Sequence, residues 1–126
     1  MAKDWPAGTA AGLVRLLYKR VLERDVDDSG LITWGCALDN GELSVKEIVR
    51  RLGKSDEYRS RFVIPFSPAK SARLMYQHFL ARQPESDKVV EGWADVISDE
   101  GWQVAVDGFV DSAEYGKRFG DNKVPA

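Results

Sequence analysis

The stretch "SVKEIVRRLGKSDEYRSRF" (residues 44–62) decides the fold, because it contains two helix starts in succession. Ser44 with Glu47 three residues later is the pattern of a capping box, which fixes where the first helix begins. The apolar residues that follow recur at the spacing i, i+3, i+4 and i+7, which is typical of a helix with one buried face. These residues are Val45, Ile48, Val49 and Leu52.

The end of the same stretch predicts a short second helix. Ser55 stands at its expected cap, and Tyr58 and Phe62 are four residues apart, so both rings lie on one face. The first interpretation is that this face packs the short helix onto the rest of the protein. The alternative is that the aromatic ends stay partly exposed and anchor a partner, since Tyr and Arg are favoured at interfaces.

A second copy of these signals follows later in the chain. "RLLYKRVLER" (15–24) matches "RLMYQHFLAR" (73–82) at an offset of 58, and "SDEYRSRF" (55–62) matches "SAEYGKRF" (112–119) at an offset of 57. No stretch shows the alternation of a half-buried strand. We therefore expect an all-α compact bundle of about six to eight helices. It would be a single domain over residues 1–126, built from two similar helical units at about 10–63 and 67–120, with flexible ends at 1–9 and 120–126.

Composition narrows the class of protein. The chain has 126 residues and a net charge of −2, which argues against a nucleic-acid partner, where a basic footprint is expected. Cys36 is the single cysteine, so no internal disulfide can form, and a reducing compartment such as the cytoplasm is expected. We expect no cleavable signal, because "MAKDWPAGTAAG" (1–12) lacks the basic-then-apolar order of such a segment. No apolar run approaches the roughly 20 residues that span a bilayer.

The acidic stretch "RDVDDSGLITWGC" (24–36) resembles the start of an EF-hand calcium loop. The final position of such a loop requires glutamate, however, and Cys36 stands there. The second unit has "RQPESDK" at the same place, which could not hold calcium. A turn followed by a helix start, with Asp and Ser as the capping residues, explains both stretches better, and no metal site is predicted.

Residues for catalysis are scarce. His78 is the only histidine, and it aligns with Arg20 of the first unit, so we expect it on a helix surface. Cys36 is expected to fill a small apolar site. Nothing in the sequence brings the two together as a nucleophilic pair. A small lyase or isomerase is disfavoured because no acid–base pair near a pocket is visible. We predict no catalytic, cofactor-binding or metal-binding residue.

Basic side chains gather at the end of the helix that begins at Ser44. One interpretation is a solvated surface whose cations suit a helix C-terminus. The other is a docking surface for an acidic partner, in which arginines pair with carboxylates and steer association. The cluster comprises Arg50, Arg51, Lys54, Arg59 and Arg61.

Three segments together resemble the phycobilisome linker-polypeptide domain, over about residues 38–125. They are "NGELSVKEIVRRLGKSDEYRSRF" (40–62), "RLMYQHFLARQP" (73–84) and "EGWQVAVDGFVDSAEYGKRFGDNKVP" (100–125). Residues 13–37 resemble phycobilisome linkers less than they resemble a related small bacterial repeat domain, marked by the pattern LYxRVLxRxxDxxGLxxW.

This resemblance implies a non-enzymatic scaffold of a light-harvesting antenna, which binds phycobiliproteins or a similar ring-forming partner. It implies no bilin of its own, only proximity to bilins of the partner. The location would be cytoplasmic, and thylakoid-associated through a phycobilisome in a cyanobacterium. The expected partner-binding residues are Arg50, Arg51, Arg59, Arg61, Tyr58, Phe62, Trp102 and Tyr115. The alternative is a self-associating or surface-assembly domain of a non-photosynthetic bacterium, which the slightly acidic charge favours.

Overall fold

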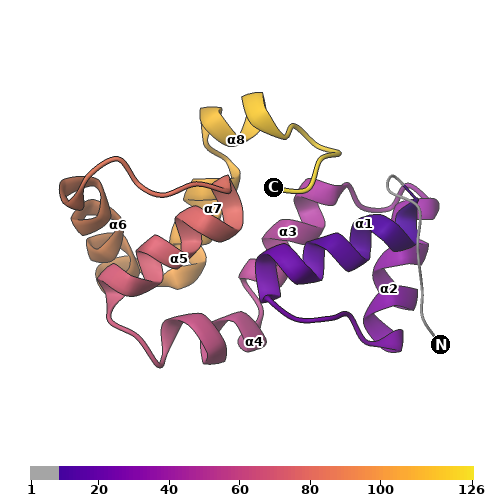
Figure 1. Ribbon diagram of the computed structural model, residues 1–126, viewed down its shortest axis with the longest axis horizontal. Helices are drawn as coiled ribbons and strands as arrows, with labels where there is room; N and C mark the ends of the chain where they lie inside the picture. The colour runs from indigo at the N-terminus through magenta and orange to yellow at the C-terminus, as the bar shows by residue number, and fades with distance from the viewer. Residues whose placement is uncertain (1–8) are drawn as a thin grey trace.

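The computed structural model describes residues 9–126, which form eight α-helices and two π-helical turns and contain no strand (Figure 1). The predicted all-α fold is therefore confirmed. The flexible end expected at residues 1–9 lies, apart from Thr9, outside the described residues. The first half contains α1 (Ala10–Leu17), η1 (Tyr18–Leu22), α2 (Asp28–Asp39), α3 (Val45–Gly53), α4 (Asp56–Tyr58) and η2 (Arg59–Val63). The second contains α5 (Pro68–Leu80), α6 (Asp87–Glu100), α7 (Trp102–Val110) and α8 (Ala113–Arg118).

Short polar side chains start most of these helices. Each one accepts a hydrogen bond from a backbone N–H in the first turn, which would otherwise have no partner. Asp27 does so for α2, accepting from Gly30 N at 2.7 Å, which confirms the capping interpretation of the acidic stretch. The capping residues are Thr9, Asp27, Ser44, Ser55, Ser67, Ser86 and Ser112.

The helices form two groups with a shared centre. In Figure 1, α1–α3 lie on one side and α5–α7 on the other, while α4 and α8 lie on opposite sides of the junction. Helix α3 packs against α7, and η1 packs against α5, so each group contacts the other through two elements. Between α6 and α7, Gly101 adopts a φ of +103°, which lets one helix follow the other directly.

One hydrophobic core runs through both groups of helices. Phe79 of α5 is fully buried at the centre, with its ring 5.5 Å from that of Tyr58 and 6.2 Å from that of Phe109. Trp93 of α6 stacks on Phe109 at 4.1 Å. Because Tyr58 comes from the first half and the other rings from the second, neither half encloses this core alone.

The two halves make equivalent contacts. In the first, Trp34 Nε1 donates to the hydroxyl of Tyr18 at 3.0 Å; in the second, Trp93 Nε1 donates to that of Tyr76 at 3.2 Å. The residue that ends η1 and the residue that ends α5 both adopt a left-handed backbone conformation, with φ 54° at Glu23 and φ 52° at Ala81. The echo in the sequence thus corresponds to repeated geometry.

The C-terminal end differs from the flexible tail expected over residues 120–126. The carbonyl of Asp121 accepts a hydrogen bond from Lys46 N at the start of α3 (3.0 Å), and Val124 and Pro125 are buried. A backbone hydrogen bond therefore ties this end of the chain to α3, and two apolar residues near it are buried, which the local sequence pattern does not reveal.

Candidate interaction surface

The predicted basic cluster divides into paired and unpaired residues. Arg50 of α3 donates to Asp107 Oδ1 at 2.7 Å and contacts Asp111 Oδ1 at 2.5 Å, both near the end of α7. Lys54 Nζ lies 2.9 Å from Asp107 Oδ2. These ion pairs join α3 to α7, so the cations of Arg50 and Lys54 are already neutralised within the chain.

The electrostatics of this junction agree with its geometry. Partial burial tends to raise the pKa of Asp107, but hydrogen bonds from Lys54 and Arg50 outweigh it and hold that pKa below its ordinary value. The hydrogen bond from Arg50 likewise lowers the pKa of Asp111. Both carboxylates are partly exposed, so solvent screening keeps the contribution of each pair to stability small.

The remaining cations lie nearer the surface. Arg51 and Arg59 are exposed, and the guanidinium of Arg59 lies 5.5 Å from the ring centre of Trp102. Trp102 is partly buried and donates its indole N–H to the carbonyl of Gly53 at 3.1 Å. The structure therefore brings Arg59 and Trp102 together as a cation–π pair that faces solvent on one side.

The predicted aromatic residues of the short helices face the core. Tyr58 and Tyr115 have no exposed surface, and Phe62 is 7% exposed. Tyr58 lies 5.0 Å from Phe62, and Tyr115 lies 5.3 Å from Phe119, between ring centres. The interpretation that these i, i+4 pairs pack the short helices onto the bundle is confirmed, and in this conformation Tyr58 and Tyr115 offer no side-chain surface to a partner.

Sequence reasoning missed a charged clamp that holds α4 to the end of η1. Arg24 donates from Nε and Nη2 to the two carboxylate oxygens of Glu57, at 2.6 and 2.9 Å. Arg61 contacts the same carboxylate at 3.4 Å and donates to the carbonyl of Leu22. The hydrogen bond from Arg24 lowers the pKa of Glu57. Arg61 is therefore committed to contacts within its own half.

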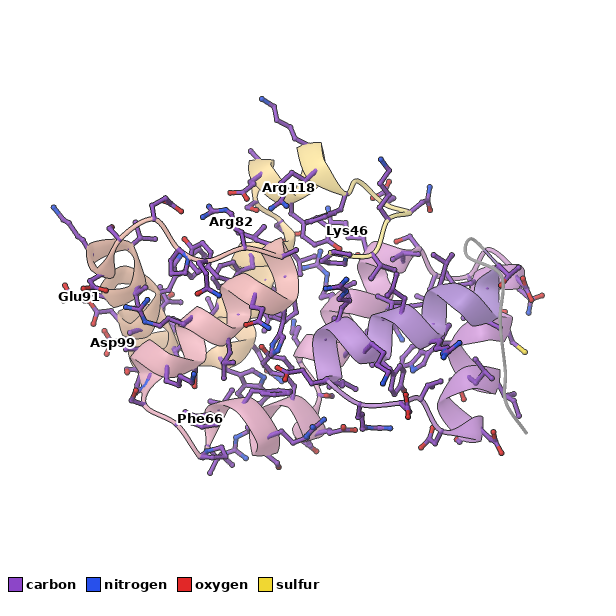
Figure 2. The ribbon with its side chains drawn as sticks, in the orientation of Figure 1. Lys46, Phe66, Arg82, Glu91, Asp99 and Arg118 are labelled. Carbon is purple, nitrogen blue, oxygen red and sulfur yellow. The ribbon has the colours of Figure 1, made fainter. Side chains whose placement is uncertain are left out.

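The second half contains the same clamp, between α8 and the end of α5. Arg82 donates from Nε and Nη2 to Glu114, both at 2.8 Å, and Arg118 contacts that carboxylate at 3.2 Å. Arg118 also donates to the carbonyl of Leu80. Figure 2 shows Arg82 and Arg118 close together beside α8. The matching positions in the two sequence copies are the signal that could have revealed both clamps.

The halves differ at one buried row of hydrogen-bonded side chains, which is centred on His78. His78 is fully buried, so the prediction that it lies on a helix surface is wrong. Its Nε2 lies 2.5 Å from a carboxylate oxygen of Glu23, and its Nδ1 lies 2.8 Å from the hydroxyl of Tyr58. A carboxylate can only accept, so Nε2 carries the proton of the neutral imidazole and Tyr58 donates to Nδ1. The hydrogen bonds of Glu23, His78 and Tyr58 therefore join the end of η1 to α5 and α4.

The two equivalent tyrosines should respond oppositely to loss of their hydroxyl groups. Tyr58→Phe leaves the buried Nδ1 of His78 without its donor, and we expect a loss of about 1–2 kcal/mol in unfolding free energy. The hydroxyl of Tyr115 is buried with no hydrogen-bond partner among the described residues. Tyr115→Phe should therefore be neutral or slightly stabilising. Urea denaturation of both variants measures the difference, and equal losses would contradict the assignment.

His78 should titrate below the ordinary histidine pKa. Burial lowers its pKa from 6.5, and this outweighs the hydrogen bond that Nε2 donates to Glu23, which acts in the opposite direction. The unfolded chain then takes up the proton first, so stability due to His78 is complete above pH 6.5 and falls as the pH drops below it. Because His78 is the only histidine, NMR of its imidazole protons reads this pKa directly. A pKa of 6.5 or higher would show that the Glu23 carboxylate outweighs burial at His78, contrary to this prediction.

No arrangement for catalysis emerges from these contacts. Cys36 lies exposed on α2, so the prediction that it fills an apolar site is wrong. Both ring nitrogens of His78 are occupied inside the protein, so its imidazole cannot act as a base for that thiol. Within residues 9–126, no group of three or more His, Cys, Asp or Glu side chains is placed to hold a metal ion. None of the helices there combines the length and apolar character that crossing a membrane requires.

A shallow groove of about 570 Å³ lies between α1, the end of α2 and the start of α3. Leu13, Leu38 and Leu43 line it together with Asp39 and Ser44. Among the described residues that line this groove there is no Lys, Arg or His, and none of the predicted partner-binding residues.

Comparison with known proteins gives one consistent family. The family model described as Phycobilisome Linker polypeptide matches residues 7–126. The chain is 35% identical over 116 residues to the phycobiliprotein ApcE of Nostoc sp., covering 90% of this chain and 10% of that protein. It is 32% identical over 124 residues to the phycobilisome 39 kDa linker polypeptide, phycocyanin-associated, rod, of Microchaete diplosiphon.

A further relative is the phycobilisome 32.1 kDa linker polypeptide, phycocyanin-associated, rod 1, of Synechocystis sp., at 33% identity over 124 residues. Both of these linker matches cover 97% of this chain and 43% of the relative. The chain thus spans between a tenth and less than half of the length of the curated relatives it matches.

Proposed function

This chain belongs to the phycobilisome linker polypeptide family, and we propose on that premise that it binds phycobiliproteins and fixes their positions in a larger assembly. The observation that carries the proposal is the match along residues 7–126, together with relatives whose names describe them as phycocyanin-associated rod linkers. This family is non-enzymatic, in agreement with the occupied imidazole and the separate, exposed thiol.

In the proposed mechanism the protein acts as a rigid body that fills a space between its partners and so fixes their positions. The inter-half ion pairs at Arg50 and the shared core around Phe79 hold the helices in one arrangement, so the outer surface presents fixed anchors. Among the predicted partner-binding residues, Arg51 and Arg59 are the exposed cations available for an acidic partner, with Trp102 beside Arg59. Charged groups of this kind steer association and set its salt dependence.

Sedimentation velocity with purified phycocyanin tests the proposal. The partner absorbs visible light through its bilins, whereas the linker family implies no bilin on this chain, so the visible boundary follows phycocyanin alone. We expect that boundary to move faster when the chain is added, with saturation at a fixed molar ratio. The chain without phycocyanin is the control for colour. An unchanged boundary with the chain at tens of micromolar, at both low and high salt, would mean that any binding is far weaker than a Kd of about 1 μM. That result would overturn the proposal.

The proposed location follows from the same partner, namely the cytoplasm, beside a thylakoid through the phycobilisome. Self-association in a non-photosynthetic bacterium stays an alternative prediction. Light scattering on the purified chain would favour that alternative if it showed a stable oligomer that does not bind phycocyanin.

A further inference from the structure

The loop between η2 and α5 exposes three consecutive apolar residues, Ile64, Pro65 and Phe66. Residues 64–70 are all exposed, and no longer exposed run occurs among the described residues. Ile64 is 60% exposed and Phe66 is 41% exposed, with Pro65 between them. Figure 2 places Phe66 at the edge of the molecule opposite Lys46 and Arg118. Contiguous exposed apolar side chains of this kind commonly mark an interaction site.

The second half of the chain shows that the fold does not need these apolar residues. At the offset of 57, the positions equivalent to 64–66 are Asp121, Asn122 and Lys123. Both segments follow the same aromatic pair, ending in Phe62 and Phe119, which are buried to the same extent at 7% exposed. The segment after the short helix is therefore polar in the second copy and apolar in the first. Because the same turn forms with polar residues, the apolar character of 64–66 requires another explanation.

The stretch of sequence that contains this loop carries charges of a single sign. Residues 58–84 contain five Lys and Arg residues and no Asp or Glu, in a chain whose net charge is −2. Arg59 and Lys70 flank the apolar residues, are exposed, and form no ion pair among the described residues. By contrast, Arg61 and Arg73 are paired, with Glu57 and Asp87. Two cations without an ion pair therefore flank the exposed apolar residues in the sequence, and the guanidinium of one of them, Arg59, lies over Trp102.

We propose that residues 59–70 form the docking surface for a phycobiliprotein, at a place where that partner exposes apolar side chains bordered by carboxylates. The inference rests on the proposed function and assigns it to a particular surface. Ile64 and Phe66 would be buried at the centre, where truncation of a residue costs most, while Arg59 and Lys70 would pair with carboxylates at the rim. The charge complementarity favours an acidic protein partner over a second, identical basic loop.

A charge-neutral double variant taken from the second half tests this assignment. Ile64→Asp with Phe66→Lys gives the residues that the equivalent positions 121 and 123 carry. The matched control is Ile32→Lys with Val104→Asp, which changes two other exposed hydrophobic residues, 65% and 45% exposed, on α2 and α7. Titration of phycocyanin with each protein should show at least a tenfold weaker affinity for the first variant, roughly the cost of losing one central anchor. The control should match the unchanged chain.

A second variant, Arg59→Gln with Lys70→Gln, should weaken binding at low salt and reduce its dependence on salt concentration. This variant decides the question if the first one fails to fold, as circular dichroism would show. If the unchanged chain binds phycocyanin and both loop variants bind equally well, the docking assignment is overturned while the proposed function stands. If the unchanged chain does not bind, the proposed function fails and this inference fails with it.

Discussion

Phe79→Ala is expected to lower the free energy of unfolding by about 3–5 kcal/mol, the usual cost of removing a fully buried aromatic ring. The ring is 0% exposed and lies at the centre of the core shared by the two halves, against Tyr58 and Phe109. Its removal leaves a cavity that neither half can close by itself. Urea denaturation, with the midpoint and slope compared against the unchanged chain, measures the loss.

Phe66→Ala is the matched control for this change, since the same side chain is removed at a position that is 41% exposed. We expect it to change stability by no more than about 0.5 kcal/mol, as is usual for a surface substitution. Similar losses at Phe79 and Phe66 would show that Phe79 does not occupy the centre of the core.

Gly53→Val should destabilise the protein by about 1–3 kcal/mol, the range seen when a packed core is overfilled. Gly53 lies where α3 meets the second half. A Cβ atom there would be 2.7 Å from Cζ of Phe79 and 2.8 Å from Cγ1 of Val106, closer than real Cβ atoms approach. The helices would have to separate, which would also disturb the hydrogen bond from Trp102 to the Gly53 carbonyl. Thermal unfolding followed by circular dichroism measures the effect.

Gly35→Ala provides the control for Gly53. This glycine lies within α2, and a Cβ added there would meet no atom within 4 Å apart from its chain neighbours and the backbone of its own helix. Because alanine favours the helix by about 0.8–1.0 kcal/mol over glycine, the substitution should raise stability. A destabilisation at Gly35 as large as that at Gly53 would show that adding a side chain is costly even where no close neighbour is present, and the loss at Gly53 could then not be assigned to the contact between the halves.

The fold could be predicted because its signals are local. The serine caps and the i, i+3, i+4 and i+7 spacing of α3 lie within one or two turns of each other, and the structure contains them. The echo between residues 15–24 and 73–82 adds a constraint that single helices lack, since equivalent segments should make equivalent contacts. The Tyr18–Trp34 and Tyr76–Trp93 hydrogen bonds meet that expectation.

Where the repeat misled, a long-range partner was responsible. The alignment of His78 with Arg20 predicted a surface position. His78 can instead be buried because Glu23 and Tyr58, 55 and 20 residues away, form hydrogen bonds with its two ring nitrogens. Arg50 resembled a docking cation for a similar reason, because its partners in α7 lie 57 and 61 residues away. Local spacing carries no information about such partners.

A linker that fixes the positions of its neighbours must itself be rigid, so the proposed function depends on the two halves sharing one core. Differential scanning calorimetry of the purified chain tests this most directly. We expect a single transition whose calorimetric enthalpy equals its van't Hoff enthalpy, which is the signature of one cooperative unit. Two resolved transitions, or a van't Hoff enthalpy about half the calorimetric value, would show that the halves unfold separately and would contradict the shared core.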